Sequence, residues 1–560
     1  MERVFHADAM WRYVLLLRGA DALIKSGEVK KMDAKDLIEK GKSVLGIEFG
    51  STRIKAVLVD EKGNPIASGS KEWENELLDG IWTYSEKAIW DGLAECYADL
   101  KKNVKDQYGV TIKKLGAIGF SAMMHGYLPF DENDKLLVPF RTWRNTITEE
   151  AAAKLTEALN FNIPQRWSIA HLYQAILNGE YHVPSIRHFT TLAGYVHFKL
   201  SGKKVLGVGD ASGMFPIDSK TGNYDKKMIK IFDGLIKDCG FPWKISDILP
   251  EVLTAGDNAG ELTEEGAKLL DIDGDLSSGI PMCPPEGDAG TGMVATNSVL
   301  VETGNISAGT SVFAMIVLKE NMKNLHKEID MVTTPAGDPV AMVHCNNCTS
   351  EINAWVRIFD ELGKLMGKEF DRGELFSKLY GVALEGDKDC GGLISYNYFS
   401  GEPVTGFSKG SPLFVRTAED SFTLPNFMRM HLYSALATLK VGLDILTVEE
   451  KVKVKKMYGH GGFFKTPKAG QTIASAATGS PVSVMETAGE GGAWGIALLA
   501  LYMTEKKEKQ TLASYLEDVI FAGSTGTELM ASPEDIEGFT TFMKKYVAGL
   551  SVEQAAVVFL

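Results

Sequence analysis

The segment Gly46–Lys55, with the sequence GIEFGSTRIK, places the carboxylate of Glu48 directly before a Gly-Ser-Thr turn at residues 50–52. Such a turn can bring backbone N–H and hydroxyl groups to a phosphate, and a neighbouring carboxylate can bind Mg²⁺ through water. A turn of the same composition can also close a β-hairpin and bind nothing. The segment alone therefore indicates either a phosphate site or a structural turn.

A second acidic residue, Asp288, lies in a glycine-rich segment just before an expected helix. Its small neighbours would let a substrate or a phosphate approach the backbone closely; they are Gly287, Ala289, Gly290 and Gly292. An aspartate here can accept a proton from a substrate hydroxyl or cap the helix. The similar segment Gly256–Gly260 precedes a surface helix with no apolar strand before it, so we interpret Asp257 as a capping residue.

Two further glycine clusters lie in the second half of the chain. Tyr458–Pro467 follows an expected strand and precedes a helix, which is where α/β folds place nucleotide-binding turns. Met485–Met503 leads into an apolar helix through small residues, and close helix packing explains those residues as well as a binding turn does. Only the first cluster therefore favours a nucleotide site.

Cys345 and Cys348 form a C-x-x-C pair, a spacing that also occurs in redox motifs and zinc sites. No second pair lies within metal-site spacing, and no thioredoxin-like pattern surrounds this one. We therefore interpret the pair as core packing or as packing close to a substrate.

Composition restricts the class of protein. At 560 residues and 45% hydrophobic composition, the chain can bury a large core and is expected to form two or three domains. Its net charge of -14 argues against nucleic acid or an anionic membrane as the main partner and favours a small-molecule substrate. Six cysteines are too few for a disulfide scaffold, and neither a signal-peptide pattern nor a membrane-length apolar run occurs, which predicts a cytoplasmic protein.

Both halves of the chain open with the same order of expected elements. From Ser43 the pattern predicts three strands, a helix at Ser85–Gln107 and a strand at Leu115–Ala122. After residue 297 it predicts three short strands within Val299–Val317, then helices at Asn353–Met366 and Leu424–Leu446 and a strand at Lys453–Tyr458. This order predicts a duplicated α/β architecture with a cleft between two lobes.

Four parts of the chain are predicted. They are a helical N-terminal extension at residues 1–42, a first lobe at 43–296, a second lobe at 297–505 and a helical C-terminal segment at 506–560. The apolar faces of the C-terminal helices favour packing on a domain core. The N-terminal extension could pack on its own chain, support a homodimer, or both.

Five segments appear in the order found in the FGGY carbohydrate kinases, a branch of the actin-like (ribonuclease H-like) ATPase superfamily. The chain resembles that family, over residues 44–503, in GIEFGSTRIKAVLVD, FSAMMHGYLPFD, GDASGMFPID, PEGDAGTGM, and the pair SAGTSVFAMIV and YGHGGFFK. The resemblance implies an α/β fold of two actin-like ATPase lobes with an interdomain cleft. It also decides the question at Glu48 in favour of a phosphate site.

The resemblance implies a role for each matching residue. Asp288 would be the general base that takes the proton of the sugar hydroxyl as it attacks the γ-phosphate of ATP, and Glu48 would face Mg²⁺. Lys55 would be structural. The sugar pocket would be lined by Met124, His125, Gly126, Trp143, Asn145 and Asp288. The nucleotide would be held by Gly50, Ser51, Thr52, Gly309, Thr310, Gly461, Gly462 and Gln471.

The implied reaction is the ATP-dependent phosphorylation of the terminal primary hydroxyl of a ketopentose. The Met-His-Gly triplet at residues 124–126 resembles the xylulose kinases. The chain length and the altered acidic residue at position 48 also agree with the ribulose kinases, which stay an alternative. A lone histidine before a turn, such as His125, is also typical of a structural residue. The expected partners are a sugar and ATP, without nucleic acid or membrane.

The chain also departs from the family pattern. Glu48 and Asn145 stand where aspartates are usual, Ala170-His171 replaces a Pro-Lys pair, Ser434-Ala435 replaces a Glu-Gly pair, and His460 is unusual in its glycine-rich turn. Two other hypotheses stay open. One is an actin-like ATPase that activates a partner enzyme and holds an iron–sulfur cluster through cysteines shared across a dimer. The other is a regulator that binds ATP without turning over a sugar.

Overall fold

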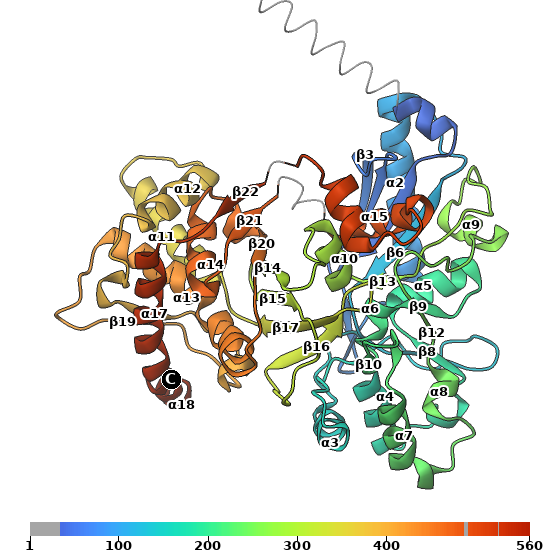
Figure 1. Cartoon of the computed structure of the whole chain (residues 1–560), viewed down its shortest axis with the longest axis horizontal. Helices are drawn as coiled ribbons and strands as arrows, with labels where there is room; N and C mark the ends of the chain where they lie inside the picture. Colours follow the sequence, from blue (N-terminus) through green and yellow to red (C-terminus); the bar gives the residue numbers. More distant parts are fainter. Residues whose placement is uncertain (1–33, 486–490, 525) are drawn as a thin grey trace, which may run out of the picture.

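The computed structural model describes residues 34–485, 491–524 and 526–560, which form two lobes (Figure 1). Most of the predicted N-terminal extension, residues 1–33, lies outside these ranges, and the described chain begins with a short helix at residues 34–39. Within these ranges, none of the helices combines the length and the apolar character needed to cross a membrane.

The first lobe is built on a five-stranded sheet in the order β13-β6-β1-β2-β3. The strands are β1 (Val44–Phe49), β2 (Arg53–Val59), β3 (Pro65–Glu72), β6 (Ala117–Ala122) and β13 (Glu286–Gly287). The first three pair antiparallel, whereas β6 pairs parallel with both β1 and β13. Because β6 is buried along its whole length, it needs helices on both faces, and α2 (Glu86–Tyr108) and α15 (Gly491–Glu505) pack against this sheet (Figure 1).

The second lobe is built on a seven-stranded sheet in the order β16-β17-β15-β14-β20-β21-β22. Its strands are β14 (Thr303–Ala308), β15 (Val312–Val317), β16 (Ile329–Thr333), β17 (Pro339–Cys345), β20 (Lys456–His460), β21 (Val482–Val484) and β22 (Thr527–Leu529). As in the first lobe, an antiparallel meander precedes a parallel strand, here β20 beside β14. The prediction of two α/β lobes that open alike is confirmed.

One detail of the second sheet differs from the prediction. The segment Val299–Val317 forms two strands instead of three, because residues 299–302 make a turn in which Glu302 has φ 66. The third strand of the meander is β17, which follows an additional strand, β16. Short apolar runs broken by glycine do not by themselves distinguish a strand from a turn.

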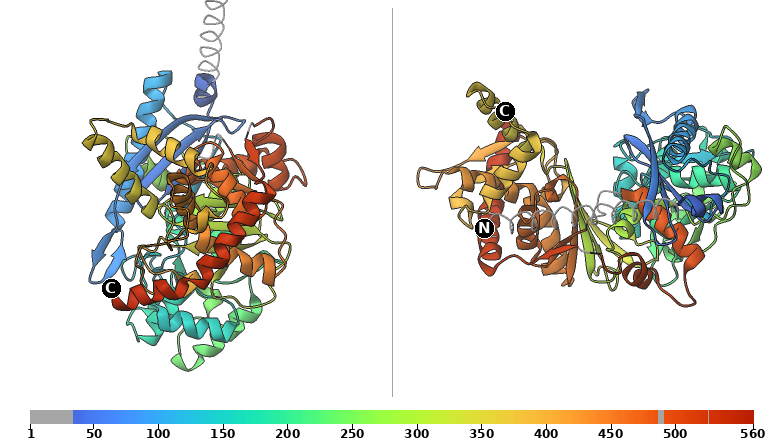
Figure 2. Two further views of the ribbon diagram at one scale, coloured as in Figure 1. Left: turned by 90° about the vertical axis from the view of Figure 1, so that its left-hand side faces the viewer. Right: turned by 90° about the horizontal axis from the view of Figure 1, so that it is seen from above.

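Helices cover the second sheet (Figures 1 and 2). They are α11 (Ser350–Leu365), α12 (Arg372–Ala383), α13 (Leu424–Asp444), α14 (Ala469–Thr478), α17 (Pro533–Ala548) and α18 (Leu550–Phe559). The predicted helices at Asn353–Met366 and Leu424–Leu446 correspond to α11 and α13. Helix α13 is buried on nearly all sides up to Leu439, which makes it the central helix of this lobe.

The remaining regular elements are short or lie at the edges of the lobes. In the first lobe they are β4 (Glu76–Leu78), β5 (Ile81–Thr83), β7 (Leu128–Phe130), β8 (His188–Thr190), β9 (Val205–Gly207), β10 (Ile217–Asp218), β11 (Asn223–Tyr224), β12 (Glu251–Leu253), α3 (Glu149–Leu159), α4 (Ser168–Leu177), α5 (Leu192–Ser201), α6 (Val208–Ala211), α7 (Lys226–Leu235), α8 (Ile245–Ile248), α9 (Glu264–Leu270) and α10 (Asp288–Ala295). Later in the chain are β18 (Ile394–Tyr396), β19 (Leu413–Val415) and α16 (Leu512–Tyr515).

Packing does not follow the predicted boundaries at the end of the chain. Helix α15 lies within the range predicted for the second lobe, yet it packs on β1 and β6 of the first sheet. Leu512 of the C-terminal segment belongs to the same core as α15, whereas Phe539 and Phe542 of α17 belong to the core of the second lobe. The C-terminal segment is therefore shared between the lobes.

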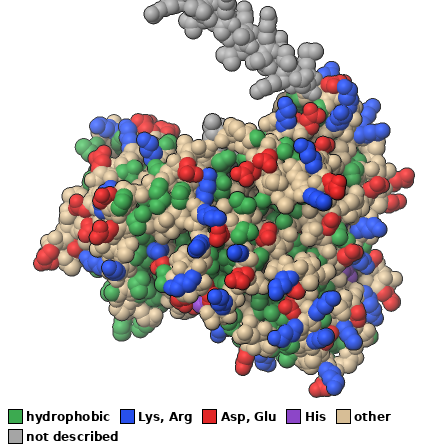
Figure 3. All heavy atoms as spheres, in the orientation of Figure 1, with side chains coloured by type: hydrophobic (Ala, Val, Ile, Leu, Met, Phe, Trp, Pro, Cys, Tyr) green, Lys and Arg blue, Asp and Glu red, His purple; other side chains and the backbone are tan. Residues whose placement is uncertain are grey.

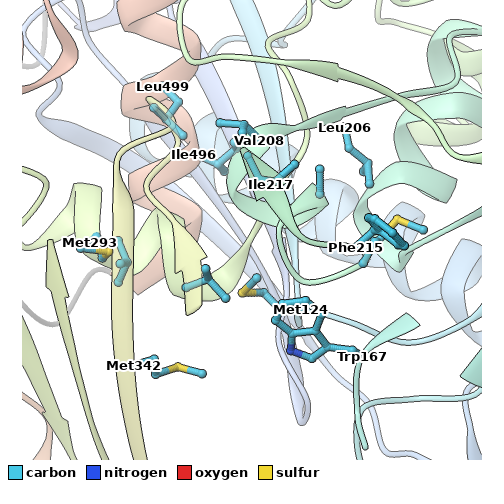
Figure 4. Close-up of a cluster of buried hydrophobic side chains, with 14 of the residues drawn as sticks. Met124, Trp167, Leu206, Val208, Phe215, Ile217, Met293, Met342, Ile496 and Leu499 are labelled. Carbon is cyan, nitrogen blue, oxygen red and sulfur yellow. The ribbon is translucent and has the colours of Figure 1, made fainter. Parts of the chain in front are cut away.

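A buried apolar cluster joins the two lobes (Figure 4). It combines Met124 and Trp167 of the first lobe with Met293 of α10 and Met342 of β17. On the outside, charged side chains of both signs are interspersed over the face shown in Figure 3. That face carries no extended field of one sign of charge.

Glycines let α15 approach the first sheet closely. A Cβ on Gly46 of β1 would lie 2.1 Å from the carbonyl oxygen of Ala493, and one on Gly119 of β6 would lie 2.7 Å from Ile496 Cγ1. Both distances are too short for a methyl group, so the helix would have to move. Within α15 itself, a Cβ on Gly495 would lie 2.1 Å from the carbonyl oxygen of Thr291 in α10, so packing also explains small residues at the start of this helix.

We predict that Gly46→Ala destabilises the protein by about 1–3 kcal/mol or more, because the new methyl group overpacks the contact with α15. The matched control is Gly381→Ala in α12, where a Cβ would meet no atom within 4 Å and alanine is the better helix former. Differential scanning calorimetry should show a lower Tm for the first variant and an unchanged or higher Tm for the second. Equal shifts in the two variants would contradict the packing argument.

Candidate active site

A cleft of about 400 Å³ lies between the lobes. Its wall includes Glu48, Ser51 and Asp288 from the first lobe and Asn305, Ser311 and His460 from the second. A larger hollow of about 900 Å³ lies beside the helix at residues 34–39, but none of the predicted site residues lines it. The interlobe cleft is therefore the candidate active site.

Glu48 is held between a strand and a helix. It lies near the end of β1, opposite Lys55 of β2, and accepts hydrogen bonds from the backbone N–H groups of Gly492 and Ala493 at the start of α15. Gly492 has no side chain to obstruct this contact; a Cβ there would lie 2.3 Å from Glu48 Oε1. Burial first, and then the charge of Asp288, raise the pKa of Glu48 to about 7.

Asp288 is the first residue of α10 and follows directly on β13. The backbone N–H of Met124 donates to its Oδ1 at 3.3 Å. Burial raises the pKa of Asp288 to about 6, although backbone N–H groups around the start of α10 act in the opposite direction. Around neutral pH its carboxylate is mostly ionised and can accept a proton, which is what a general base requires.

Two buried acids behind Asp288 were not predicted. Thr191 donates to Asp210 Oδ2 at 2.6 Å, and burial raises the pKa of Asp210 to about 7. Glu286 accepts the N–H of Asp210 at 2.9 Å, and burial raises its pKa to about 8. The motifs GDASG and PPEGD contain both residues, but their burial is visible only in three dimensions.

His125 is locked in place by two neighbours. Its Nδ1 lies 3.0 Å from the carbonyl oxygen of Gly213, and Arg166 donates through Nε to its Nε2 at 3.3 Å. These contacts require the proton on Nδ1, and burial lowers the pKa of His125 to about 3, so the ring is neutral. His125 lines the cleft together with Met124, and it has structural partners as well. The contacts support the structural interpretation of His125, and its role in the sugar pocket stays a prediction.

Arg166, which the sequence did not single out, connects the lobes at the cleft. Its guanidinium pairs with Asp330 of β16, and Asn162 donates to Asp330 Oδ1 at 3.0 Å. On the same side, the exposed ring of Trp143 lines the cleft and donates to Ser51 Oγ at 3.3 Å. This wall therefore offers an aromatic face and a cation.

Asn145 and Gln471, which were predicted to bind ligands, lie outside the cleft wall and bind backbone groups instead. Asn145 is buried and binds the backbone of Trp82, accepting its N–H at 2.8 Å and donating to its carbonyl oxygen at 2.8 Å. Gln471 is buried in α14 and donates to the carbonyl oxygens of Val482 and Thr527 at 3.1 and 2.6 Å. In this structure both amides hold loops and strands together and do not face a ligand.

The predicted glycine turns lie next to the cleft but do not form its wall. Ser51, Ser311 and His460 line the cleft, whereas the turn residues beside them do not. These turn residues are Gly50, Thr52, Gly309, Thr310, Gly461 and Gly462. Gly126 is likewise outside the wall and forms the turn after His125 with φ 91. Gly461 has φ 95, and a Cβ there would lie 2.4 Å from the carbonyl oxygen of Ala308, so its turn packs on the end of β14.

The donor set of the cleft fits Mg²⁺ better than a metal held by a protein cage. Within the described residues, no group of three or more His, Cys, Asp and Glu side chains could hold a metal ion. Magnesium keeps several waters and needs only one or two carboxylates besides phosphate oxygens, a requirement that Glu48 in the cleft wall would meet.

Cys345 and Cys348 lie in the core of the second lobe. Burial raises the pKa of both thiols, so neither is a ready thiolate ligand. Their placement agrees with the interpretation as core packing.

Comparison with known proteins gives family matches over most of the chain. Residues 43–294 match the N-terminal domain of the FGGY family of carbohydrate kinases, and residues 304–504 match its C-terminal domain. A xylulose kinase of Haemophilus influenzae is 20% identical over 480 residues, covering 84% of this chain and 92% of the relative. A gluconokinase of Bacillus subtilis is 31% identical over 118 residues, covering 21% and 22% of the two chains.

Solved structures share the fold. A ligand-bound xylulose kinase from Lactobacillus acidophilus has a TM-score of 0.73 and 17% identity, covering 92% of this chain and 99% of the other. Glycerol kinase of Plasmodium falciparum with ADP has a TM-score of 0.71 and 16% identity, covering 91% and 98%. Two family domains in the predicted order, on a shared two-lobed fold, lead to one conclusion: the chain belongs to the FGGY family of carbohydrate kinases.

Proposed function

We propose that this sugar kinase transfers the γ-phosphate of ATP to the terminal primary hydroxyl of a ketopentose, D-xylulose or L-ribulose, giving the 5-phosphate. The observation that carries the proposal is Asp288, an ionisable carboxylate at the start of α10 that faces the interlobe cleft near Glu48. The relatives named xylulose kinases over 84% of this chain favour the ketopentose. Cytoplasmic location fits the six free cysteines.

In the proposed reaction Asp288 accepts the proton of the substrate hydroxyl as its oxygen attacks the γ-phosphorus. The new O–P bond forms, the bond between the γ-phosphorus and the bridging oxygen breaks, and ADP leaves with that oxygen. The hydrogen bond from Met124 N–H keeps one carboxylate oxygen oriented, which leaves the other for the proton. Met123, Phe313 and Met342 in the cleft wall help to exclude water.

Substrate binding is assigned to two sets of residues in the cleft. Met124, His125, Arg166 and Trp143 would line the sugar site, with the remaining N–H groups of Arg166 for polar contacts and the ring of Trp143 as an aromatic face. Ser51 and Ser311, with the glycine turns beside them, would hold the phosphates of the nucleotide. Glu48 would hold Mg²⁺, which when bound neutralises charge on the phosphate oxygens.

Asp288→Asn should abolish sugar-dependent ADP release, with a loss of about 10²–10⁴-fold or more, because the general base is removed. ADP release with Mg-ATP should be measured against D-xylulose, L-ribulose, other ketoses, glycerol and gluconate. The control is Asp257→Asn: Asp257 is exposed, lies outside the cleft and accepts the backbone N–H of Thr254 at 2.9 Å. It does not cap the following helix α9 as predicted, because the N-cap residue of α9 is Thr263. A wild-type rate that no sugar stimulates, with ATP still bound, would exclude the kinase and leave the regulator hypotheses.

The pH dependence should show the raised pKa of the base. Since burial raises the pKa of Asp288 to about 6, it becomes protonated, and loses its function, as the pH falls through 6. At saturating Mg²⁺, which would keep Glu48 ionised, we expect kcat/KM to decrease about tenfold per pH unit below that point. At limiting Mg²⁺ the protonation of Glu48, whose pKa is about 7, should make the decrease steeper. A profile that stays flat down to pH 5 would contradict this.

Glu48→Gln should raise the Mg²⁺ concentration needed for half-maximal activity by about tenfold or more, because a neutral amide is a weaker ligand than a carboxylate. Glu48→Asp, which restores the acidic residue usual in the family, should keep most of the activity. Titrating the rate with Mg²⁺ at saturating sugar checks both. If Glu48→Gln showed the wild-type requirement, Glu48 would not be a magnesium ligand.

A further inference from the structure

Arg166 and Asp330 form an ion pair between the lobes, and the proposed roles use only the arginine. Arg166 precedes α4 of the first lobe, and its Nη2 donates to Oδ2 of Asp330 in β16 of the second lobe. Arg166 lines the cleft with 26% of its side chain exposed, whereas Asp330 does not line the cleft and is 10% exposed. The acid therefore acts on the site only through the arginine.

Hydrogen bonds on both sides hold this ion pair in place. At one end Asn162 donates to Asp330 Oδ1 at 3.0 Å. Burial raises the pKa of Asp330, but the hydrogen bond and the charge of Arg166 oppose that shift and favour the carboxylate. At the other end Arg166 Nε donates to His125 Nε2 at 3.3 Å, and His125 Nδ1 lies 3.0 Å from the carbonyl oxygen of Gly213. Asp330 thus restrains Arg166, and Arg166 restrains His125.

The same pair sets the positive charge of the cleft wall. Among the described residues that line the cleft, Arg166 is the only Lys or Arg. The histidines there are neutral near pH 7, because burial lowers the pKa of His125 to about 3 and the pKa values of His344 and His460 to about 4. Since the carboxylate of Asp330 balances the charge of Arg166 at ion-pair distance, another anion in the cleft gains little from the arginine.

This balance favours one class of substrate over another. The other charged residues in the described part of the cleft wall are the acids Glu48 and Asp288. A carboxylate on the substrate would therefore meet like charges there, and the one arginine is already paired. A hydroxyl group needs no opposite charge and can accept a hydrogen bond from a guanidinium that is held by its own acid.

We infer that Asp330 is a specificity-determining residue of the sugar site: by balancing the charge of Arg166 from the other lobe, it makes the site select an uncharged sugar over a sugar acid. This inference deepens the proposed function and rests on it, because it takes the wall with His125 and Arg166 as the sugar side. Asp330 is a positioning residue, since it acts through Arg166. The sugar side obtains its balance of charge only where the two lobes meet.

Two five-carbon compounds test the inference. Xylitol and D-xylonate differ at C1, where the first carries a CH₂OH group and the second a carboxylate. Their binding to full-length wild type and to Asp330→Asn should be measured by isothermal calorimetry without nucleotide. Asparagine keeps an acceptor oxygen for Arg166 but removes the negative charge. We expect it to strengthen the binding of xylonate about tenfold or more, the effect of one charge-assisted hydrogen bond, and to change that of xylitol by less than about threefold.

Two further variants separate this role from a structural one. The double variant Arg166→Gln/Asp330→Asn should lose the gain for xylonate, because the unbalanced charge is removed with the arginine. Asp338→Asn alters an aspartate in the turn of the same β-hairpin, outside the cleft wall, and should keep the wild-type ratio of xylonate to xylitol affinity. A damaged fold does not produce a selective gain in affinity, and the Tm of each variant checks folding.

Three results would overturn the inference: an unchanged or undetectable preference for xylonate in Asp330→Asn, a gain that persists without Arg166, or an equal gain for ATP, which would show that the charge does not act on the sugar side. Failure of the proposed function gives a different result. If no sugar stimulated ADP release by wild type while Asp330→Asn still gained affinity for xylonate, the kinase assignment would fail and the role of Asp330 in a binding site would stand.

Discussion

The contact between Glu48 and the start of α15 is the constraint on which the site depends. A carboxylate on a strand accepts two backbone N–H groups of a helix that arrives from the far end of the sequence. This requires the helix to lie almost on the sheet, which Gly46, Gly119 and Gly492 permit because they carry no side chain. The same approach brings α15 against α10, the helix that begins with Asp288. The residues proposed as base and as metal ligand are thus positioned by one packing arrangement.

Burial of acids gives the cleft its chemistry. Four carboxyl groups, those of Glu48, Asp210, Glu286 and Asp288, lie where water is scarce, and burial is the largest cause of the raised pKa in each. In such surroundings an added cation or a lost proton changes the energy of the neighbouring groups strongly. The ionisation of these four carboxyl groups is therefore expected to be sensitive to any charge that enters the cleft.

Much of the fold and of the candidate site could be predicted from the sequence, because the motifs depend on residues that lie close together in the chain. The turn after Glu48, the aspartate at the start of α10 and the first opening meander depend on residues close in the chain, whereas the third strand of the second meander, β17, comes from residues 339–345 and was not predicted. The amides of Asn145 and Gln471 could not be assigned, since their partners, Trp82 and Thr527, are more than 50 residues away. The packing of α15 on the first sheet could not be predicted for the same reason: an apolar helix does not reveal which sheet it covers.

The placement of α15 makes the first lobe discontinuous in sequence. Its central sheet is complete by Gly287, but one face is covered only by residues 491–505, which follow most of the second lobe. During synthesis about 200 further residues are added after Gly287 before α15 is made and can cover the apolar face of β1 and β6. At ordinary elongation rates this delay is on the order of ten to forty seconds. The first part of the protein to be made is therefore among the last to finish folding.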